Sequence, residues 1–259
     1  MFLSIDAGNS NVVFGFFDDQ LKEWIKILRI DTKKSFNLLA LEKTLGLFFL
    51  ENEMSSHEVH QIGFSTVVPE LERTIFQLCQ NFFDQDPYVI NGRSYQKLSI
   101  HTQNPYEIGS DLMANMAAAY QKYQQACIIV DFGTALTFST LDKSGIVISV
   151  NIVPGIKTAL HSLFSNTAKL PKVKMEMPPS VLGKNTVESI QTGIFYGYSG
   201  LVKGVLQAIK EETKTEYKVI ATGGMSTLLT HLKDSFNLID EKLTLEGIKL
   251  ITTLNTGVK

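Results

Sequence analysis

Two Asp-x-Gly motifs stand out among the residues whose types and spacing could do chemistry. Residues 4–18, SIDAGNSNVVFGFFD, resemble residues 129–142, IVDFGTALTFSTLD. In each, an apolar run ends at Asp-x-Gly, a small polar residue follows, and a second apolar run leads away. Asp6 aligns with Asp131 at an offset of 125 residues, about half of the 259-residue chain. One copy would be an ordinary turn. Two copies in the same setting predict two similar lobes that face each other across a cleft.

The composition of these turns suits phosphate binding. Backbone N–H groups approach a phosphate closely where glycine and other small residues leave space, and carboxylates hold Mg²⁺, usually through retained waters. Residues 6–11 and 131–134 offer both features. A third glycine signal, residues 221–224 (ATGG), ends a predicted strand and could lie against a nucleotide base or ribose. A P-loop is not indicated, because Pro178 stands where the first glycine of that motif would be required. A Rossmann site is not indicated either, because no GxGxxG follows a strand.

Asp111 is a candidate general base. It follows the segment NPYEIGS (104–110) and falls in the first turn of a predicted helix, where the helix dipole stabilises an ionised carboxylate. A plain helix-starting acid is one interpretation. The other is a base that takes the proton from a substrate hydroxyl, as phosphoryl transfer can use.

Short apolar runs alternate with longer amphipathic ones, which predicts an α/β fold. The strands are expected at 2–5, 12–17, 23–30, 61–67, 87–90, 126–131, 135–141, 146–153 and 217–222. The helices are expected at 37–52, 70–83, 110–123, 185–213 and 243–254. The predicted division gives a first lobe of residues 1–114 and a second of residues 115–259.

Composition narrows the functional classes. A net charge of −2 and a pI near 6.2 argue against a basic nucleic-acid-binding surface. Cys79 and Cys127 are too few for a disulfide framework or a zinc site. There is neither a signal-peptide pattern at the start nor a run of about 18 apolar residues that could span a membrane. We therefore expect a soluble, cytoplasmic protein.

Glycines recur at spacings of four, three and four on the long predicted helix, at positions 193, 197, 200 and 204. A membrane dimer motif is opposed by Glu188, Lys203 and many polar neighbours. The spacing instead predicts tight contact with another helix, which a homodimer would supply.

These motifs together resemble the type III pantothenate kinases, which share the fold of actin, the sugar kinases and the heat-shock ATPases. The resemblance covers nearly the whole chain, in family order and spacing. Its blocks are DAGNSN (6–11), STVVP (65–69), NPYEIGSD (104–111), DFGTALTF (131–138), PGI (154–156), LP (170–171), NTVESIQTGIFYG (185–197), ATGG (221–224) and LEGIKL (245–250).

The resemblance implies two ribonuclease H-like lobes, an actin-like ATPase fold, and ATP-dependent phosphorylation of pantothenate, the first step of coenzyme A synthesis. It implies contacts with ATP from Asp6, Ala7, Gly8, Asn9, Ser10, Asn11, Val12, Val13 and Thr134. It implies contacts with pantothenate from Thr102, Gly109, Ser110, Asp111, Leu112 and Thr186, with Asp111 as proton acceptor. Asp131 would bind a monovalent cation, K⁺ or NH₄⁺, and Asp6 would hold Mg²⁺ mostly through water.

The chain departs from the family pattern around the substrate. Leu112 replaces an arginine, which removes a fixed cation with up to five donors. Thr102 stands where the family has a tyrosine, and Val150-Asn151 replace a glycine pair. Two alternatives therefore stay open: a pantothenate-kinase-like binding or regulatory protein without full activity, and a kinase of the same fold acting on another small hydroxyl compound.

Overall fold

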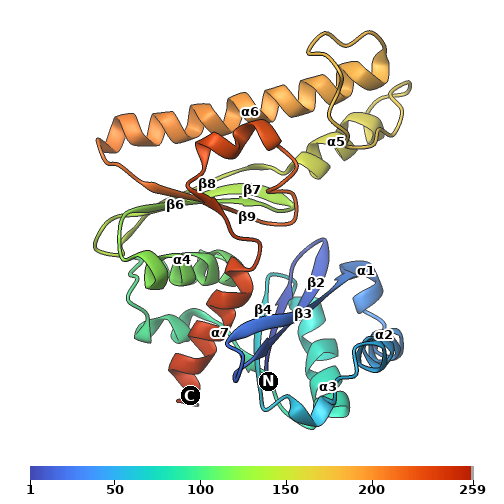
Figure 1. Ribbon diagram of the computed structural model, residues 1–259, viewed down its shortest axis with the longest axis vertical. Helices are drawn as coiled ribbons and strands as arrows, with labels where there is room; N and C mark the ends of the chain where they lie inside the picture. Colours follow the sequence, from blue (N-terminus) through green and yellow to red (C-terminus); the bar gives the residue numbers. More distant parts are fainter. Residues whose placement is uncertain (258–259) are drawn as a thin grey trace. The chain divides into compact units, whose positions relative to one another are not determined.

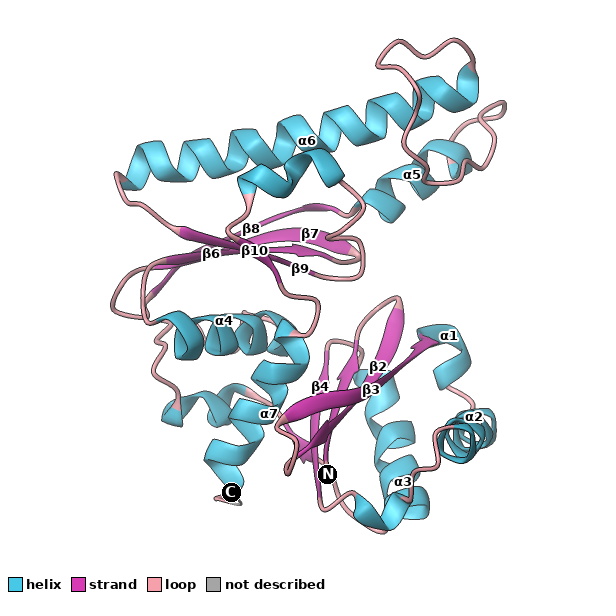
Figure 2. Ribbon diagram, in the orientation of Figure 1, coloured by secondary structure: helices cyan, strands magenta, loops and turns pink. Residues whose placement is uncertain are grey.

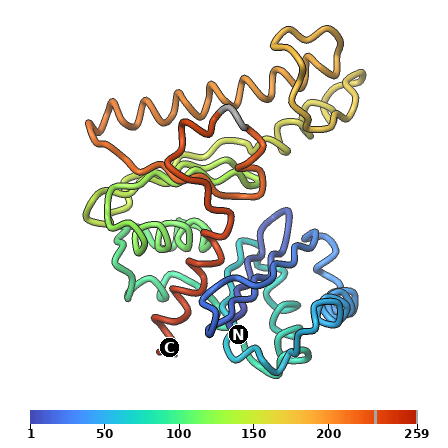
Figure 3. Tube along the Cα trace, viewed as in Figure 1, coloured from blue at the N-terminus to red at the C-terminus, as the bar shows by residue number. Residues whose placement is uncertain are grey.

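The computed structural model describes residues 1–257, except for the side chains of Thr230 and His231. The chain forms two compact units. The first contains residues 1–123 together with the C-terminal segment from residue 242, and the second contains residues 124–241. Both ends of the chain therefore belong to the first unit, as the colours of the trace show (Figure 3).

The first unit is built on a five-stranded sheet in the order β3-β2-β1-β4-β5. β2 pairs antiparallel with β1 and β3, while β4 runs parallel to β1 and to β5. The bounds are β1 (Phe2–Ala7), β2 (Asn11–Asp18), β3 (Glu23–Asp31), β4 (Gln61–Thr66) and β5 (Tyr88–Val89).

Helices cover both faces of this sheet (Figure 2). They are α1 (Thr32–Ser35), α2 (Leu38–Glu51), α3 (Glu72–Phe83), α4 (Ser110–Tyr123) and α7 (Leu243–Thr256), with 3₁₀ turns η1 (Ser56–Glu58), η2 (Pro69–Leu71) and η3 (Gly92–Lys97). Alternate residues of β1 point to opposite faces. Leu3 and Ile5 are fully buried in a core shared with α2 and α3. On the other face, the Ser4 hydroxyl donates to the carbonyl of Leu245 on α7, at 2.9 Å.

The second unit repeats the same sheet. Its order is β10-β9-β6-β7-β8, with β7 antiparallel to β6 and β8 and with β9 parallel to β6 and β10. The elements are β6 (Cys127–Phe132), β7 (Ala135–Leu141), β8 (Val147–Pro154), α5 (Ile156–Ser165), α6 (Thr186–Thr213), β9 (Lys218–Thr222), η4 (Thr230–Ser235) and β10 (Leu238–Ile239). The long α6 packs over one face of the sheet, where Val130 meets a core that includes Phe195 and Val202 (Figure 1).

The α/β prediction is confirmed, and so are the predicted strands and the long helices. The short α5, η4 and β10 were not expected. The two units also differ from the predicted lobes of 1–114 and 115–259, because all of α4 and α7 lie in the first unit.

α7 packs against α4: Gly247 lies against the backbone of Ala114, and Lys122 Nζ is 3.3 Å from Glu246 Oε2. Within residues 1–257, no helix is both long and apolar enough to cross a bilayer.

Candidate functional site

The turn between β1 and β2 carries the first Asp-x-Gly motif. Its backbone is held in place: the Gly8 N–H donates to the Asn11 carbonyl at 3.0 Å, and the Thr32 hydroxyl donates to the Gly8 carbonyl at 2.7 Å. Asn9 and Ser10, at the tip, are exposed. A fixed, exposed turn of small residues can bring backbone N–H groups against the oxygens of a phosphate.

The other predicted ATP-binding residues of the segment 6–13 differ in how far their side chains are exposed to solvent. Ala7 and Val12 are fully buried and Val13 is nearly so, because their side chains belong to the core. These three positions can therefore meet a nucleotide only through their backbone. Asp6, the last residue but one of β1, keeps part of its surface exposed.

The turn between β6 and β7 carries the second motif in a tighter form. The Gly133 N–H donates to the Ala135 carbonyl at 3.1 Å. The Thr134 carbonyl accepts from the Gly155 N–H at 3.0 Å and from the Thr158 hydroxyl at 2.7 Å, so the start of α5 holds this turn. Gly133 and Thr134 are exposed at its tip.

Two hydroxyl groups flank Asp131 in the second sheet. Asp131 is in register with Thr137 on β7 and with Thr222 on β9, and residues opposite each other in neighbouring strands project from the same face. The hydroxyl oxygens of both threonines are buried and have no hydrogen-bond partner among the described residues. Gly223 adopts a φ of +89°, and a side chain there would collide with Asp131 Oδ1. The result is a group of oxygen atoms of the kind that binds hard cations.

Neither threonine was singled out from the sequence, because threonine is an ordinary strand residue. A signal was nevertheless present. Thr137 lies within DFGTALTF, and Thr222 lies within ATGG. The sequence could not show that strand register places both hydroxyls beside Asp131.

Asp111 lies in the first turn of α4, as predicted. The Leu112 N–H donates to Asp111 Oδ1 at 2.8 Å. Asp111 keeps some of its surface exposed, but the protein atoms around its carboxyl bury it enough to raise its pKa, against the lowering effect of that hydrogen bond. Gly109 makes this geometry possible, because a Cβ there would lie 2.5 Å from Asp111 Oδ1.

Ser110 ties the start of α4 to the end of β4. Its Oγ lies 2.8 Å from Ser65 Oγ and donates to the Thr66 carbonyl at 3.1 Å. Ser65 is in register with Asp6 on the neighbouring strand β1. The first unit thus brings the strand-end carboxylate Asp6 and the helix-start carboxylate Asp111 to the same end of its sheet.

The remaining predicted substrate residues of the first unit are Thr102, in the loop that precedes α4, and Leu112, in the first turn of α4. The Thr102 hydroxyl oxygen accepts from the Asn104 N–H at 3.3 Å, within a local turn. Tyr106 is 78% exposed, and its ring lies against Gly92. Leu112 is half-buried and has no side-chain donor, so it offers none of the hydrogen bonds that an arginine would.

Thr186 begins α6 in the second unit. The helix is capped by Asn185, whose Oδ1 accepts from the Glu188 N–H at 2.9 Å, while Glu188 in turn accepts from the Lys184 N–H at 2.9 Å. Thr186 borders an open hollow of about 560 Å³. The hollow is lined by Leu163, Leu170, Thr186, Ser189, Ile190, Gly193 and Ile194.

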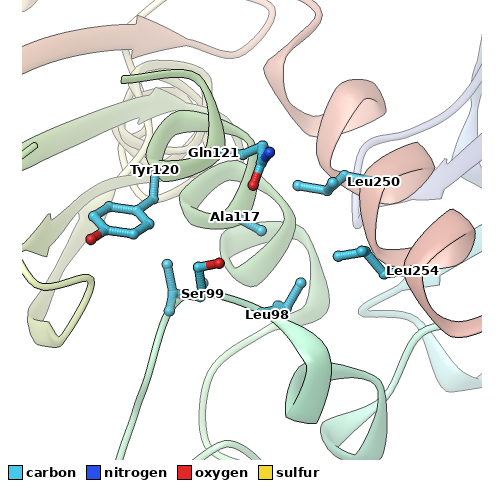
Figure 4. Close-up of a pocket in the computed structure, with 8 residues that line it drawn as sticks. Leu98, Ser99, Ala117, Tyr120, Gln121, Leu250 and Leu254 are labelled. Carbon is cyan, nitrogen blue, oxygen red and sulfur yellow. The ribbon is translucent and has the colours of Figure 1, made fainter. Parts of the chain in front are cut away.

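A second cavity lies within the first unit, between α4, α7 and the segment that follows η3. Leu250 and Leu254 of α7 point into it from one side, and Tyr120 and Gln121 of α4 border it on the other (Figure 4). Its volume is about 10 Å³, enough for one water molecule. This cavity is therefore a packing defect, too small for a nucleotide or a small acid.

Comparison with known proteins gives one consistent family. A family model described as type III pantothenate kinase matches residues 2–208. A protein named type III pantothenate kinase from Citrifermentans bemidjiense is 39% identical over 257 residues, which span 98% of this chain and 100% of that relative.

Solved structures agree on the fold. A Baf family protein from Campylobacter jejuni gives a TM-score of 0.56 at 20% identity, over 99% of this chain and 100% of its own. MreB 5 of Spiroplasma citri, bound to AMPPNP, gives 0.51 at 12% identity, over 99% and 97%. At these identities the likeness concerns the fold alone, and it confirms the predicted actin-like ATPase fold with two ribonuclease H-like lobes.

Proposed function

The chain belongs to the type III pantothenate kinase family, and we propose that it transfers the γ-phosphoryl group of ATP to the terminal hydroxyl of pantothenate. The products are ADP and 4′-phosphopantothenate, and the reaction is the first step of coenzyme A synthesis. The observation that carries this proposal is the match to that family over nearly the whole chain. ATP and pantothenate are both cytoplasmic metabolites in this role, so we place the enzyme in the cytoplasm.

Asp111 is the proposed base. As the substrate oxygen bonds to the γ-phosphorus and the bond to the β-phosphate oxygen breaks, the hydroxyl proton passes to the Asp111 carboxylate. A base works best when its pKa lies near the working pH, and burial moves the pKa of Asp111 upward in that direction. Gly109 leaves the carboxylate room at the start of α4.

The two Asp-x-Gly turns are the proposed contacts for ATP. Residues 6–13 and Thr134 supply backbone N–H groups and small polar side chains, and the hydrogen bonds described above fix both turns before ligand arrives. A preorganised set of donors stabilises developing phosphate charge without rearranging during the reaction.

Two kinds of cation fit the residues present. Among the described residues, no three His, Cys, Asp or Glu side chains gather to hold a metal, which suits Mg²⁺ that arrives with ATP and meets Asp6 through water. A monovalent cation, K⁺ or NH₄⁺, suits Asp131, because the buried hydroxyls of Thr137 and Thr222 beside it have no other partner. Such a cation would neutralise charge on the transferring phosphoryl group.

We also propose that the enzyme is a homodimer that uses the N-terminal part of α6 and the segment before it. Val181, Leu182 and Val187 are exposed there, at 55%, 74% and 41%. A Cβ at Gly193, Gly197, Gly200 or Gly204 would meet nothing within 4 Å in the described chain. The predicted tight helix contact would therefore have to come from a second copy.

The test is mass-spectrometric detection of 4′-phosphopantothenate after incubation of purified protein with ATP, Mg²⁺, K⁺ and pantothenate. We expect product from the wild type, at a rate that depends on K⁺, and almost none from Asp111→Asn. ADP formation with other small hydroxyl compounds but not with pantothenate would indicate a different kinase. ATP binding without any turnover would indicate a binding or regulatory protein in which Leu112 has ended catalysis.

A further inference from the structure

Tyr198 lies on α6, a helix from which only Thr186 was predicted to contact the substrate. Its side chain is 9% exposed and belongs to the core of the second unit. The Tyr198 hydroxyl donates to the Pro154 carbonyl at 2.7 Å, and the Gly155 carbonyl oxygen lies 3.3 Å from it. Pro154 is the last residue of β8 and Gly155 is the N-cap of α5. One side chain thus fixes the point at which the strand ends and the next helix begins.

Gly155 packs directly on the turn between β6 and β7. Its N–H donates to the Thr134 carbonyl at 3.0 Å, and a Cβ at Gly155 would collide with backbone atoms of Gly133 and Thr134. Three residues later, the Thr158 hydroxyl donates to the same carbonyl at 2.7 Å. The start of α5 therefore holds the turn, and Tyr198 holds the start of α5.

The Tyr198 hydroxyl acts here as a hydrogen-bond donor. Both atoms that it meets are carbonyl oxygens, which can only accept. Burial raises the pKa of the phenol, so the group stays protonated and its bond to Pro154 persists at any working pH. Because this proton is committed to the backbone, Tyr198 acts through the segment that it holds.

The ring and the hydroxyl of Tyr198 have separable roles. The ring belongs to the apolar core that α6 forms over the second sheet, together with Phe195 and Val202. A phenylalanine would fill the same space without burying a polar group. A buried tyrosine hydroxyl needs a partner, and the partner of this one is the segment that packs on the turn.

We propose that Tyr198 is a positioning residue for ATP. Through Pro154 and Gly155, it holds Gly133 and Thr134 in the place from which this turn meets the phosphates of the nucleotide. The inference rests on the proposed function, which assigns the turn to ATP. Groups that are fixed in advance bind a ligand without a further cost in ordering.

The test is the Tyr198→Phe variant, which removes the hydroxyl and keeps the ring. We expect the dissociation constant for AMPPNP, measured by calorimetry, to rise about threefold to tenfold, as when one hydrogen bond is lost. The KM for ATP should rise by a similar factor. The KM for pantothenate should stay within about twofold of the wild type, because effects at separate sites are largely independent.

Tyr88→Phe is the matched control. The Tyr88 hydroxyl donates to Ser94 Oγ at 2.9 Å in the first unit, so this variant loses the same kind of bond away from the turn. It should leave the affinity for AMPPNP unchanged. Weaker AMPPNP binding in Tyr198→Phe alone, with an unchanged KM for pantothenate, supports the role. Unchanged AMPPNP affinity, or an equal loss of affinity for both ligands, overturns it.

Two further results are decisive. If Tyr198→Phe does not fold, Thr158→Val tests the same hold on the turn from an exposed position. Weaker AMPPNP binding in that variant supports the proposal, and unchanged binding overturns it. A wild type that binds AMPPNP but does not phosphorylate pantothenate overturns the proposed function, while the AMPPNP comparison still decides the role of Tyr198. A wild type that binds no nucleotide overturns both.

Discussion

The β1–β2 turn and the β6–β7 turn carry the same Asp-x-Gly motif, one in each unit. Both follow the central strand of a sheet with the same strand order, and Asp6 and Asp131 occupy equivalent places. Their neighbours differ. Asp6 is in register with Val13 and Ser65, whereas Asp131 is in register with Thr137 and Thr222.

The difference lies in how the hydroxyls are used. In the first unit, the Ser65 hydroxyl pairs with Ser110 and so fixes the helix that carries Asp111. In the second unit, the Thr137 and Thr222 hydroxyls are buried without a partner in the described chain. In the first unit a strand hydroxyl holds the helix that carries the proposed base, whereas in the second unit two buried hydroxyls beside Asp131 are left for the cation that we propose there. Specialisation of a repeated fold here needs only a few strand positions to change.

The largest expected effect concerns Asp111, the proposed base in the first turn of α4. Asp111→Asn should lower kcat about a thousandfold, because general-base catalysis is worth about 10²–10⁴ in rate. Affinity for ATP should stay within about twofold in equilibrium binding. Asp84→Asn, at an exposed C-cap, is the control. Retained turnover in Asp111→Asn would contradict the base assignment.

The difference in stability between Asp111→Asn and the wild type should also depend on pH. Burial raises the pKa of Asp111 in the folded state, so the folded protein holds this proton more tightly than the unfolded chain. The wild type therefore loses stability as pH rises from the ordinary aspartate range through the raised pKa. Asp111→Asn should be the more stable protein at pH 7 in urea unfolding, and the gap should close in acid.

The second prediction is that substitutions of Asp131 and Asp6 change the dependence on different cations. Asp131→Asn should raise the K⁺ concentration for half-maximal activity about tenfold or more, because a neutral amide is a weaker ligand for a hard cation than a carboxylate. Asp6→Asn should instead raise the KM for Mg²⁺-ATP by a similar factor. The measurement is a K⁺ titration and a Mg²⁺-ATP titration of each variant. Equal responses to both titrations would mean that the turns are not specialised for different cations.

The smallest expected effect is on the free energy of unfolding. It is tested at two equivalent positions, Thr222 on β9 and Ser65 on β4. Thr222→Val removes a buried, unpaired hydroxyl and should stabilise the protein by about 1 kcal/mol in K⁺-free buffer, since burial without a hydrogen bond is unfavourable. Ser65→Ala removes a partner of Ser110 and should destabilise it by about 1 kcal/mol. Urea unfolding measures both changes. Destabilisation by Thr222→Val would show that its hydroxyl already has a structural role.

Much of the fold follows from local patterns in the sequence. The 125-residue offset between Asp6 and Asp131 predicted the repeat, and Asn37, the first residue of the helix predicted over 37–52, is the N-cap of α2. Other features depend on distant contacts. β10 has only two residues, too few for a periodic pattern. Nothing within α7 itself indicates which sheet it covers.

The residues of the candidate site also fall into two groups: those that local sequence predicts and those that depend on distant contacts. Asp111 and the turn glycines could be found because their types and spacing are informative. The hydroxyls of Thr137 and Thr222 could not be found in this way, because only strand register places them beside Asp131. Their importance arises from tertiary neighbours that a single sequence does not display.

The return of α7 to the first unit has a consequence for how the chain matures. Residues 1–123 leave the ribosome before the second unit, yet the part of their sheet that α7 covers stays exposed until residues 243–256 are synthesised. Residues 124–241 form a contiguous unit, whose sheet can close on α6 as soon as that stretch has emerged. Domains usually mature in order from the N-terminus during synthesis. In this protein the second unit can be finished while the first still waits for its last helix.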